Sequence, residues 1–261
     1  MPATPGTEAR RNRAIVVSML LLVTGASWAY LISGVGMSGG MGDMIMPSIP
    51  VWDLSYAAGI FVMWSVMMAA MMLPSATPMV LFYTNIANTR LARGERGGSP
   101  SIFVSGYIAV WALFSLAATG LQYGLVSASM LSAGMAATSS YLVGMVMIGA
   151  GVYQWTPWKR TCLEHCRSPL EFVLTHWREG PRGAFAMGLR HGAYCLGCCW
   201  MLMLLLFIGG VMNLAWIAGL TLVVLVEKLA PLGHWSSRAI GGMLVIWGTT
   251  VMFMTGMRIS H

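Results

Sequence analysis

Hydrophobic residues dominate seven stretches of the chain, and shorter segments between them hold most of the charges. A membrane-spanning helix needs about 20 mostly apolar residues to cross the hydrocarbon core of a bilayer. The predicted spans are residues 14–34, 54–74, 102–122, 136–154, 187–208, 212–230 and 239–256. The fourth stretch is short and rich in glycine, so the alternative count is six spans. The pattern therefore predicts an all-α, polytopic helical membrane protein.

The composition agrees with this prediction. Of the 261 residues, 57% are hydrophobic and 9% are charged, and the mean hydropathy is +0.72, which is outside the soluble globular range. We expect residues 1–261 to form a single membrane domain in the inner (plasma) membrane of the cell. The first apolar stretch follows Arg10, Arg11 and Arg13 and could be a secretory signal. Its cleavage motif is weak, so we expect it to remain as a membrane helix.

The net charge of +7 reflects an excess of Lys and Arg, and the clusters of these residues before the first span and between later spans all fall on one side of a seven-span arrangement. Because Lys and Arg concentrate in cytoplasmic loops, the N-terminus is predicted to be cytoplasmic. The bilayer explains the basic charge, and no nucleic-acid partner is expected. Residues 35–53 then form an external Met-rich loop, and residues 155–186 form a cytoplasmic Cys-containing segment with a pair of short helices. All five cysteines lie in the cytoplasmic half, where thiols stay reduced.

One imidazole and three thiols interrupt the fifth apolar stretch, at His191, Cys195, Cys198 and Cys199. Their spacing places the first three within roughly 60° on a helix. Lipid offers such groups no hydrogen-bond partners, whereas thiolate and imidazole suit soft metal ions. The four residues extend over about 12 Å of helix, so two or three of them would need ligands from elsewhere. The alternative is that these cysteines pack as small apolar residues.

A second group of possible ligands precedes this helix, at Cys162, His165 and Cys166. Cys162 and Cys166 are four residues apart, so on a helix they share a face. We expect this group to meet Cys195 and Cys198 at the cytoplasmic mouth. Two unrelated free thiols remain the alternative.

Methionine provides a third set of soft donors, with 24 residues in the chain. The candidate ligands are Met37, Met41 and Met44 in the external loop, and Met67 and Met71 on the second span, together with Met63, Met68 and Met72. Uncharged thioethers suit Cu(I) better than zinc or magnesium. Methionine as a flexible core filler is the alternative.

Two further features lie near the cytoplasmic ends of spans. Pro74 and Pro78 are predicted to break or end the second span, with nearby hydroxyls satisfying the freed carbonyls. Glu227 would neutralise a bound cation, relay protons or mark the interface. Its neighbour Lys228 is expected to extend toward the membrane surface.

Several strings between residues 55 and 245 carry a further signal. They are Met71-Met72-Leu73-Pro74-Ser75 with Pro78, Tyr153-Gln154-Trp155-Thr156-Pro157 leading to Lys159 and Cys162, Cys166-Arg167-Ser168-Pro169, His191-Gly192, Tyr194-Cys195-Leu196-Gly197-Cys198-Cys199-Trp200, and Gly210-Val211-Met212-Asn213-Leu214 with Glu227-Lys228. Together they resemble the bacterial family of predicted metal-binding integral membrane proteins. The resemblance implies metal binding by the Cys and His residues named above, and it leaves the metal and its purpose open.

The preferred hypothesis is a membrane protein that binds a soft transition metal through Cys and His ligands, for transport, delivery or buffering. Copper as Cu(I) is the expected ion, and zinc is the alternative. A membrane thiol-disulfide oxidoreductase that uses Cys195 and Cys198 is a second hypothesis. An accessory subunit packed against a membrane metalloenzyme is a third. No hydrolase motif is present, so the sequence gives little support to an enzyme.

Overall fold

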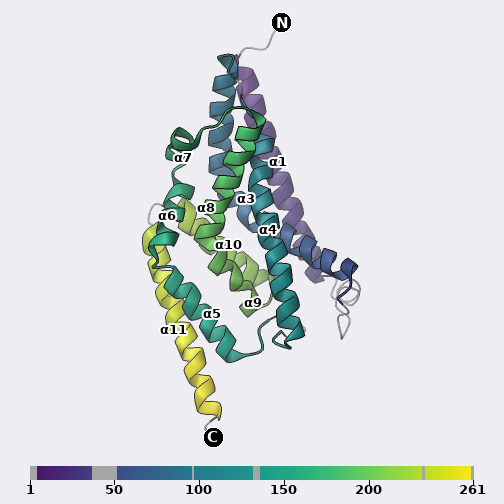
Figure 1. Ribbon diagram of the computed structural model, residues 1–261, viewed down its shortest axis with the longest axis vertical. Coiled ribbons are helices and arrows are strands. Elements are labelled where there is room, and N and C mark those ends of the chain that lie inside the picture. The colour runs from purple at the N-terminus through teal and green to yellow at the C-terminus, as the bar shows by residue number, and fades with distance from the viewer. Residues whose placement is uncertain (1–4, 37–51, 96, 132–135, 231–232, 260–261) are drawn as a thin grey trace.

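The computed structural model describes residues 5–36, 52–95, 97–131, 136–230 and 233–259. Within these ranges the regular structure is helical (Figure 1), apart from one isolated bridge between Leu131 and Ala137. The helices are α1 (Pro5–Gly36), α3 (Leu54–Ala92), α4 (Pro100–Ser127), α5 (Ser140–Tyr153), α6 (Pro157–Arg167), α7 (Pro169–His176), α8 (Gly180–Leu204), α9 (Leu206–Gly209), α10 (Leu214–Leu229) and α11 (Gly233–Ile259). The all-α prediction is therefore confirmed.

Among the residues that the structure describes, five helical segments are long and apolar enough to cross a membrane. They are Arg10–Gly34, Leu54–Ala92, Pro100–Ser127, Gly180–Gly209 and Trp235–Thr255. The fourth and sixth predicted spans correspond to α5 and α10, which have only 14 and 16 residues. The structure thus agrees with a protein of several membrane spans, and it does not establish the predicted count of seven.

Helix α3 continues through both Pro74 and Pro78, so the predicted break of the second span at residue 74 is wrong. Pro74 has no N–H, which leaves the carbonyl of Ala70 without its usual helical partner. The indole Nε1 of Trp28 in α1 donates a hydrogen bond to that carbonyl at 3.2 Å. The hydroxyl of Ser75 donates to the carbonyl of Met72 at 2.8 Å. The bond from Trp28 thus satisfies the carbonyl that Pro74 leaves free.

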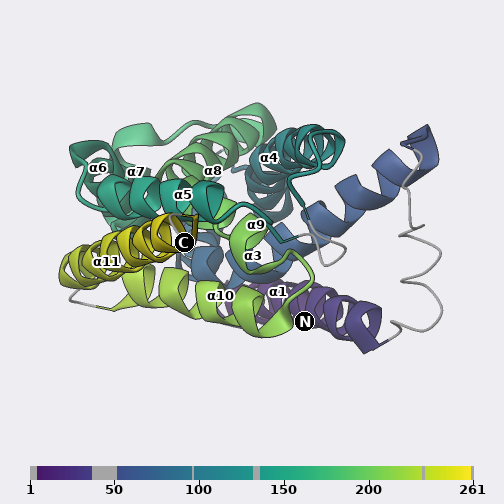
Figure 2. The same cartoon turned by 90° about the horizontal axis from the view of Figure 1, so that it is seen from below.

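Close helix pairs organise the rest of the fold. Helix α4 packs along α8, and α5 packs along α11 (Figure 2). Both pairs depend on glycine: a Cβ on Gly188 of α8 would lie 2.0 Å from the Phe103 carbonyl oxygen of α4, and one on Gly151 of α5 would lie 2.7 Å from the Gly241 carbonyl oxygen of α11. Such small residues let helix backbones approach closely, as is common in membrane proteins.

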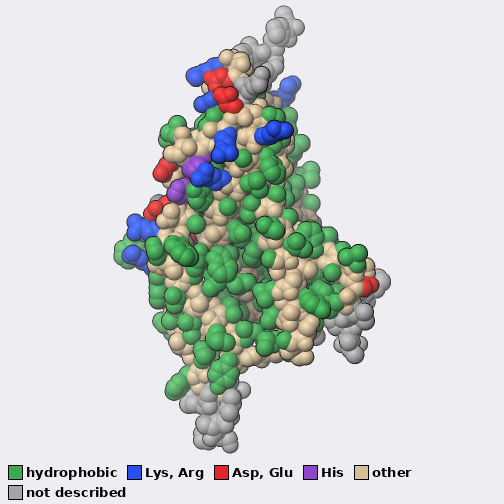
Figure 3. Space-filling model, viewed as in Figure 1, with side chains coloured by type: hydrophobic (Ala, Val, Ile, Leu, Met, Phe, Trp, Pro, Cys, Tyr) green, Lys and Arg blue, Asp and Glu red, His purple; other side chains and the backbone are tan. Residues whose placement is uncertain are grey.

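The segment between α5 and α8 contains the two short helices expected there, α6 and α7. Proline at the first turn starts each of them, because Pro157 and Pro169 need no N–H partner at that position. Helix α6 packs against α8, and α7 packs against α3. On the face drawn in Figure 3, charged and histidine side chains gather at the top and along the upper left edge, where these short helices lie.

A tight turn joins α9 to α10, as the very short predicted link required. Gly210 adopts a φ of 90°, which favours glycine. The side chain of Asn213 then caps α10 by accepting a hydrogen bond from the backbone N–H of Trp216 at 3.2 Å. The turn sends α10 back along the molecule, and this places Glu227 and Lys228 inside the bundle.

Candidate metal centre

Sulfur atoms from three helices meet inside the bundle. We call this the sulfur cluster: Cys166 of α6, Cys195, Cys198 and Cys199 of α8, and Met72 of α3. The Cys166 thiol interacts with the thiols of Cys195 and Cys198. The Sγ of Cys199 lies 3.9 Å from the Sδ of Met72. The three α8 thiols are each at most 2% exposed, and Met72 is fully buried.

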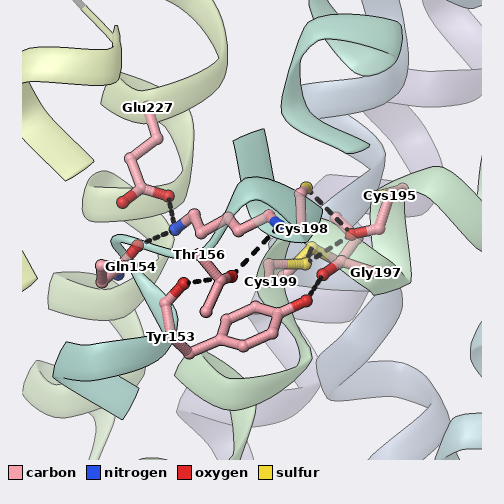
Figure 4. Close-up of polar contacts among 10 residues, drawn as sticks. Tyr153, Gln154, Thr156, Cys195, Gly197, Cys198, Cys199 and Glu227 are labelled. Atoms are coloured by element: carbon pink, nitrogen blue, oxygen red, sulfur yellow. Dashed lines mark hydrogen bonds and ion pairs between the residues drawn. The ribbon is translucent and has the colours of Figure 1, made fainter. Parts of the chain in front are cut away.

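The α8 thiols share one backbone acceptor. The Sγ of Cys198 and the Sγ of Cys199 donate hydrogen bonds to the carbonyl oxygen of Cys195, at 3.1 and 2.9 Å (Figure 4). Their spacing of three and four residues brings both thiols back to the same carbonyl, one turn earlier on the helix. Two of the four thiols are therefore satisfied by the backbone and point along one face of α8.

A buried ammonium group lies against the sulfur cluster. The Nζ of Lys228 donates to the Sγ of Cys195 at 2.9 Å and to the hydroxyl of Ser75 at 3.1 Å. Lys228 is only 7% exposed, so the expected extension of this side chain toward the membrane surface is wrong. The phenol of Tyr107 lies 3.0 Å from the same Sγ and donates to the Met72 carbonyl at 3.2 Å. Cys195 is therefore the most heavily contacted thiol of the cluster.

His191 lies one turn before Cys195 on α8 and is 2% exposed. Its ring packs between aromatic rings, with centroid distances of 5.8 Å to Tyr107 and 5.5 Å to Phe172. Its Nδ1 has no hydrogen-bond partner among the residues that the structure describes. A buried nitrogen without a partner is costly, so a ligand or water at this position would stabilise the protein.

The donor set fits a soft metal ion in type, since thiolate, thioether and imidazole are ligands of Cu(I). Within the described ranges, however, no three His, Cys, Asp or Glu side chains are already arranged to hold a metal ion. The thiols instead form hydrogen bonds with the Cys195 carbonyl, with Lys228 and with one another. An incoming ion would therefore have to replace some of these contacts.

Comparison with protein families decides the assignment. Residues 61–251 match the model of the PpoB2 family, which is described as copper chaperone. The chain belongs to this family. No curated protein and no solved structure matches the chain.

Membership in the copper chaperone family supports a copper-related function, in agreement with the metal-related character expected from the sequence. The family differs in name from the one that the sequence resembles. Its matched range includes the whole sulfur cluster together with His191 and Lys228. The range excludes Met37, Met41 and Met44, which also lie outside the described residues.

An ion pair lies beside the sulfur cluster. The Nζ of Lys159 in α6 donates to the Oε2 of Glu227 in α10 at 2.7 Å, and it also donates to the Oε1 of Gln154 (Figure 4). Lys159 and Glu227 are 1% and 2% exposed. The carboxylate of Glu227 thus neutralises the ammonium of Lys159, and this buried ion pair was not predicted from the sequence. The missed signal was periodicity, because Lys159, Leu163 and Cys166 follow one face of α6.

Not every predicted ligand joins the cluster. His165 is only partly buried, and its ring stacks on Tyr194 at a centroid distance of 4.4 Å, while its Nδ1 lies 2.9 Å from the Thr161 carbonyl oxygen. Met67 and Met71 are fully buried in the core of α3, but it is their neighbour Met72 that makes the sulfur contact. Cys162 packs on the backbone of α8, where a Cβ on Gly197 would lie 2.8 Å from its Sγ.

The two cysteines of α6 are thiols that resist ionisation. Hydrogen bonding with Cys195, and then with Cys198, raises the pKa of the Cys166 thiol well above its ordinary value. Burial, and then the proximity of Cys198, raises the pKa of the Cys162 thiol. Both thiols are therefore protonated at neutral pH, and a metal ion that binds them must displace a proton.

Proposed function

We propose that this protein binds Cu(I) as cargo in the sulfur cluster and holds it at the membrane for delivery to a partner metalloprotein. The observation that carries the proposal is the meeting of four thiols and one thioether, of which all but the half-buried Cys166 are buried. The description of the family as copper chaperone supports delivery over simple buffering. Cys195 and Cys198 would be the principal ligands. Any further ligands would come from the neighbouring donors Cys166, Cys199, Met72 and His191.

Charge balance favours Cu(I) over Zn(II) at this position. Two thiolates with one Cu(I) ion carry a net charge of −1, which the ammonium of Lys228, 2.9 Å from Cys195, offsets. The same two thiolates with Zn(II) are already neutral, so Lys228 would leave an excess positive charge. Because uncompensated charge is expensive in a buried site, the ammonium of Lys228 disfavours the binding of Zn(II). The thioether of Met72 adds to this preference.

The methionines of α3 offer a route to the cluster. Met63, Met67, Met68 and Met71 are buried along the same helix that carries Met72. Thioethers bind Cu(I) more weakly than thiolates, so an ion would pass along them toward the cysteines. The Met-rich segment with Met37, Met41 and Met44 would collect copper at the external face of the inner membrane. The proposed location is the inner membrane, with the N-terminus in the cytoplasm.

The test is a Cu(I) titration of the protein purified in detergent under reducing conditions, with a chromogenic Cu(I) chelator as competitor. We expect one tightly bound copper ion per chain, confirmed by elemental analysis, and its loss in the double variant Cys195→Ser/Cys198→Ser. Met72→Leu should weaken binding, whereas Met243→Leu, at an exposed position of α11, should not. Wild-type protein without copper above background, or with zinc bound preferentially, would exclude the proposal.

A second candidate function is supported by the contact between Lys228 and Cys195. A nearby ammonium stabilises a thiolate, and thiolates are the reactive form in disulfide exchange. The thiols of Cys195 and Cys198 would give two electrons and two protons to a partner disulfide, forming one disulfide here and a dithiol on the partner. Thiol trapping in cells separates the two functions, because an oxidised Cys195–Cys198 pair cannot hold copper.

A further inference from the structure

A cavity of about 200 Å³ lies where α6 meets the end of α5 and the beginning of α11. We call it the basic pocket. Its lining includes four cationic side chains and a single carboxylate, together with the polar side chains of Gln154 and Ser237. The cations are Lys159, Arg160, Arg167 and Arg238, and the carboxylate is Glu164. Lys159 is paired with Glu227 and Arg160 with Glu164, so the excess of positive charge in the pocket comes from Arg167 and Arg238 and favours an anionic occupant.

The cations of the pocket retain unused hydrogen-bond donors. Arg160 pairs with Glu164 at 2.9 Å, and Arg167 donates to the Ala230 carbonyl. A guanidinium group has five N–H donors in a planar fork that matches the oxygens of a carboxylate or phosphate. One bond to Glu164 and one to a carbonyl therefore leave most of these donors available to a ligand.

Gln154 gives a second, independent indication of a ligand. Its side chain is 5% exposed and lines the basic pocket. The Oε1 accepts a hydrogen bond from Lys159 (Figure 4), but the Nε2 has no partner among the described residues. A buried N–H donor without an acceptor costs free energy. An anionic oxygen in the pocket would satisfy it.

The surroundings of the pocket indicate where such an anion comes from. Trp155 lines the pocket, the Trp235 ring lies 5.8 Å from the guanidinium of the lining residue Arg238, and Trp158 is in the first turn of α6. Trp155, Trp158 and Trp235 are 51%, 78% and 67% exposed. Tryptophan is enriched at the boundary between lipid and water, where head groups lie. Basic pockets between helices at the boundary between lipid and water bind the head groups of anionic lipids.

We propose that the basic pocket binds a phosphate ester, with Arg160, Arg238 and the Nε2 of Gln154 as the main donors to its oxygens. The exposed tryptophans favour an anionic phospholipid as the source, and a soluble phosphate ester is the other source of the same chemistry. The site is separate from the sulfur cluster and needs no copper. Its contribution would be to fix α6, which carries Cys166, against the membrane surface.

The experiment uses copper-free, full-length protein in detergent and follows thermal unfolding during titration. Separate titrations use phosphatidylglycerol, phosphatidylcholine and soluble glycerol phosphate. We expect saturable stabilisation by phosphatidylglycerol and less by phosphatidylcholine. Losing two charge-assisted contacts in Arg160→Gln/Arg238→Gln should weaken binding about tenfold or more. The matched control Arg93→Gln/Arg178→Gln removes the same charge at exposed positions outside the pocket and should bind as the wild type does.

A gain of affinity provides the check that misfolding cannot imitate. Glu164→Gln removes the only carboxylate in the lining, so phosphatidylglycerol should bind several-fold more tightly because a repulsive charge is lost. Stabilisation by glycerol phosphate as well would identify the phosphate group alone as sufficient, and its absence would identify the lipid. Equal responses to phosphatidylglycerol and phosphatidylcholine, or equal losses in the pocket and control variants, would overturn the proposal.

Discussion

Two buried lysines lie near the sulfur cluster, and their partners differ in chemistry. Lys159 pairs with the carboxylate of Glu227 at 2.7 Å. Lys228 contacts the Cys195 thiol at 2.9 Å and the hydroxyl of Ser75 at 3.1 Å. An ordinary carboxylate is ionised at neutral pH, whereas an ordinary thiol is protonated. The first lysine therefore belongs to a fixed ion pair, and the second faces groups whose charge can change.

This difference separates structural support from metal chemistry. Glu227 and Lys228 are consecutive in α10, yet Glu227 extends to α6 and Lys228 extends to α8 and α3. One turn of α10 thus ties α6 in place and also supplies a positive charge to the sulfur cluster. Changing the fixed pair should mainly affect folding, and changing the sulfur cluster should mainly affect copper.

The largest expected effect is on the fixed pair. Lys159→Met leaves the carboxylate of Glu227 buried without its cation, which should lower the free energy of unfolding by about 3–5 kcal/mol. Unfolding in mixed micelles with increasing sodium dodecyl sulfate measures this. The double variant Lys159→Met/Glu227→Leu replaces the pair by apolar groups and should recover most of the loss. A double variant as unstable as the single one would show that the charges are not a coupled pair.

The next effect distinguishes the two cysteines of α6. Cys166 interacts with Cys195 and Cys198, whereas Cys162 packs on the backbone at Gly197. Removing a direct ligand should weaken Cu(I) binding by about 100-fold or more, and removing a supporting group by about tenfold. Competition titrations of Cys166→Ser and Cys162→Ser provide the comparison, and each variant is the control for the other. Equal losses would place both thiols, or neither, on the ion.

The change in copper affinity with each pH unit should be smaller than the change on removing a ligand, but it should be measurable. Hydrogen bonding with Cys195 raises the pKa of Cys166, so below that pKa copper must displace a proton. The apparent affinity should therefore fall as the pH falls, by about tenfold per pH unit for each proton released. Titrations between about pH 6 and pH 8 test this, and Cys166→Ser should show a shallower dependence. An affinity independent of pH would mean that Cys166 is not a ligand.

Periodicity along the chain was sufficient to predict which face of α8 carries the thiols, because a helix fixes the relative directions of His191, Cys195 and Cys198. The polar, charged character of residues 155–186, rather than periodicity, was sufficient to predict the short helices before α8. Periodicity was insufficient to choose Met72 over Met71 as the neighbour of Cys199, since that choice depends on how α3 and α8 cross.

The errors at Lys228 and Pro74 have a common physical cause. The expectations came from local rules: a lysine at the end of an apolar stretch usually extends to the membrane interface, and a proline inside such a stretch usually breaks the helix. In the structure, groups distant in sequence override those rules: Cys195 and Ser75 give Lys228 partners inside the bundle, and Trp28 donates to the Ala70 carbonyl that Pro74 leaves free. Local patterns cannot contain such tertiary contacts.

The smallest expected effect concerns the second lysine and completes the comparison. Lys228→Met removes an ammonium whose partners, a thiol and a hydroxyl, are both neutral when protonated. Charge-assisted hydrogen bonds are lost, but a buried charge without a counter-charge is removed at the same time. These two effects oppose each other, so the free energy of unfolding of copper-free protein should change by about 1 kcal/mol or less. The same unfolding measurement as for Lys159→Met applies, with that variant as reference. A loss equal to that of Lys159→Met would mean that Cys195 carries a permanent negative charge before any metal binds, and the two lysines would then have the same role.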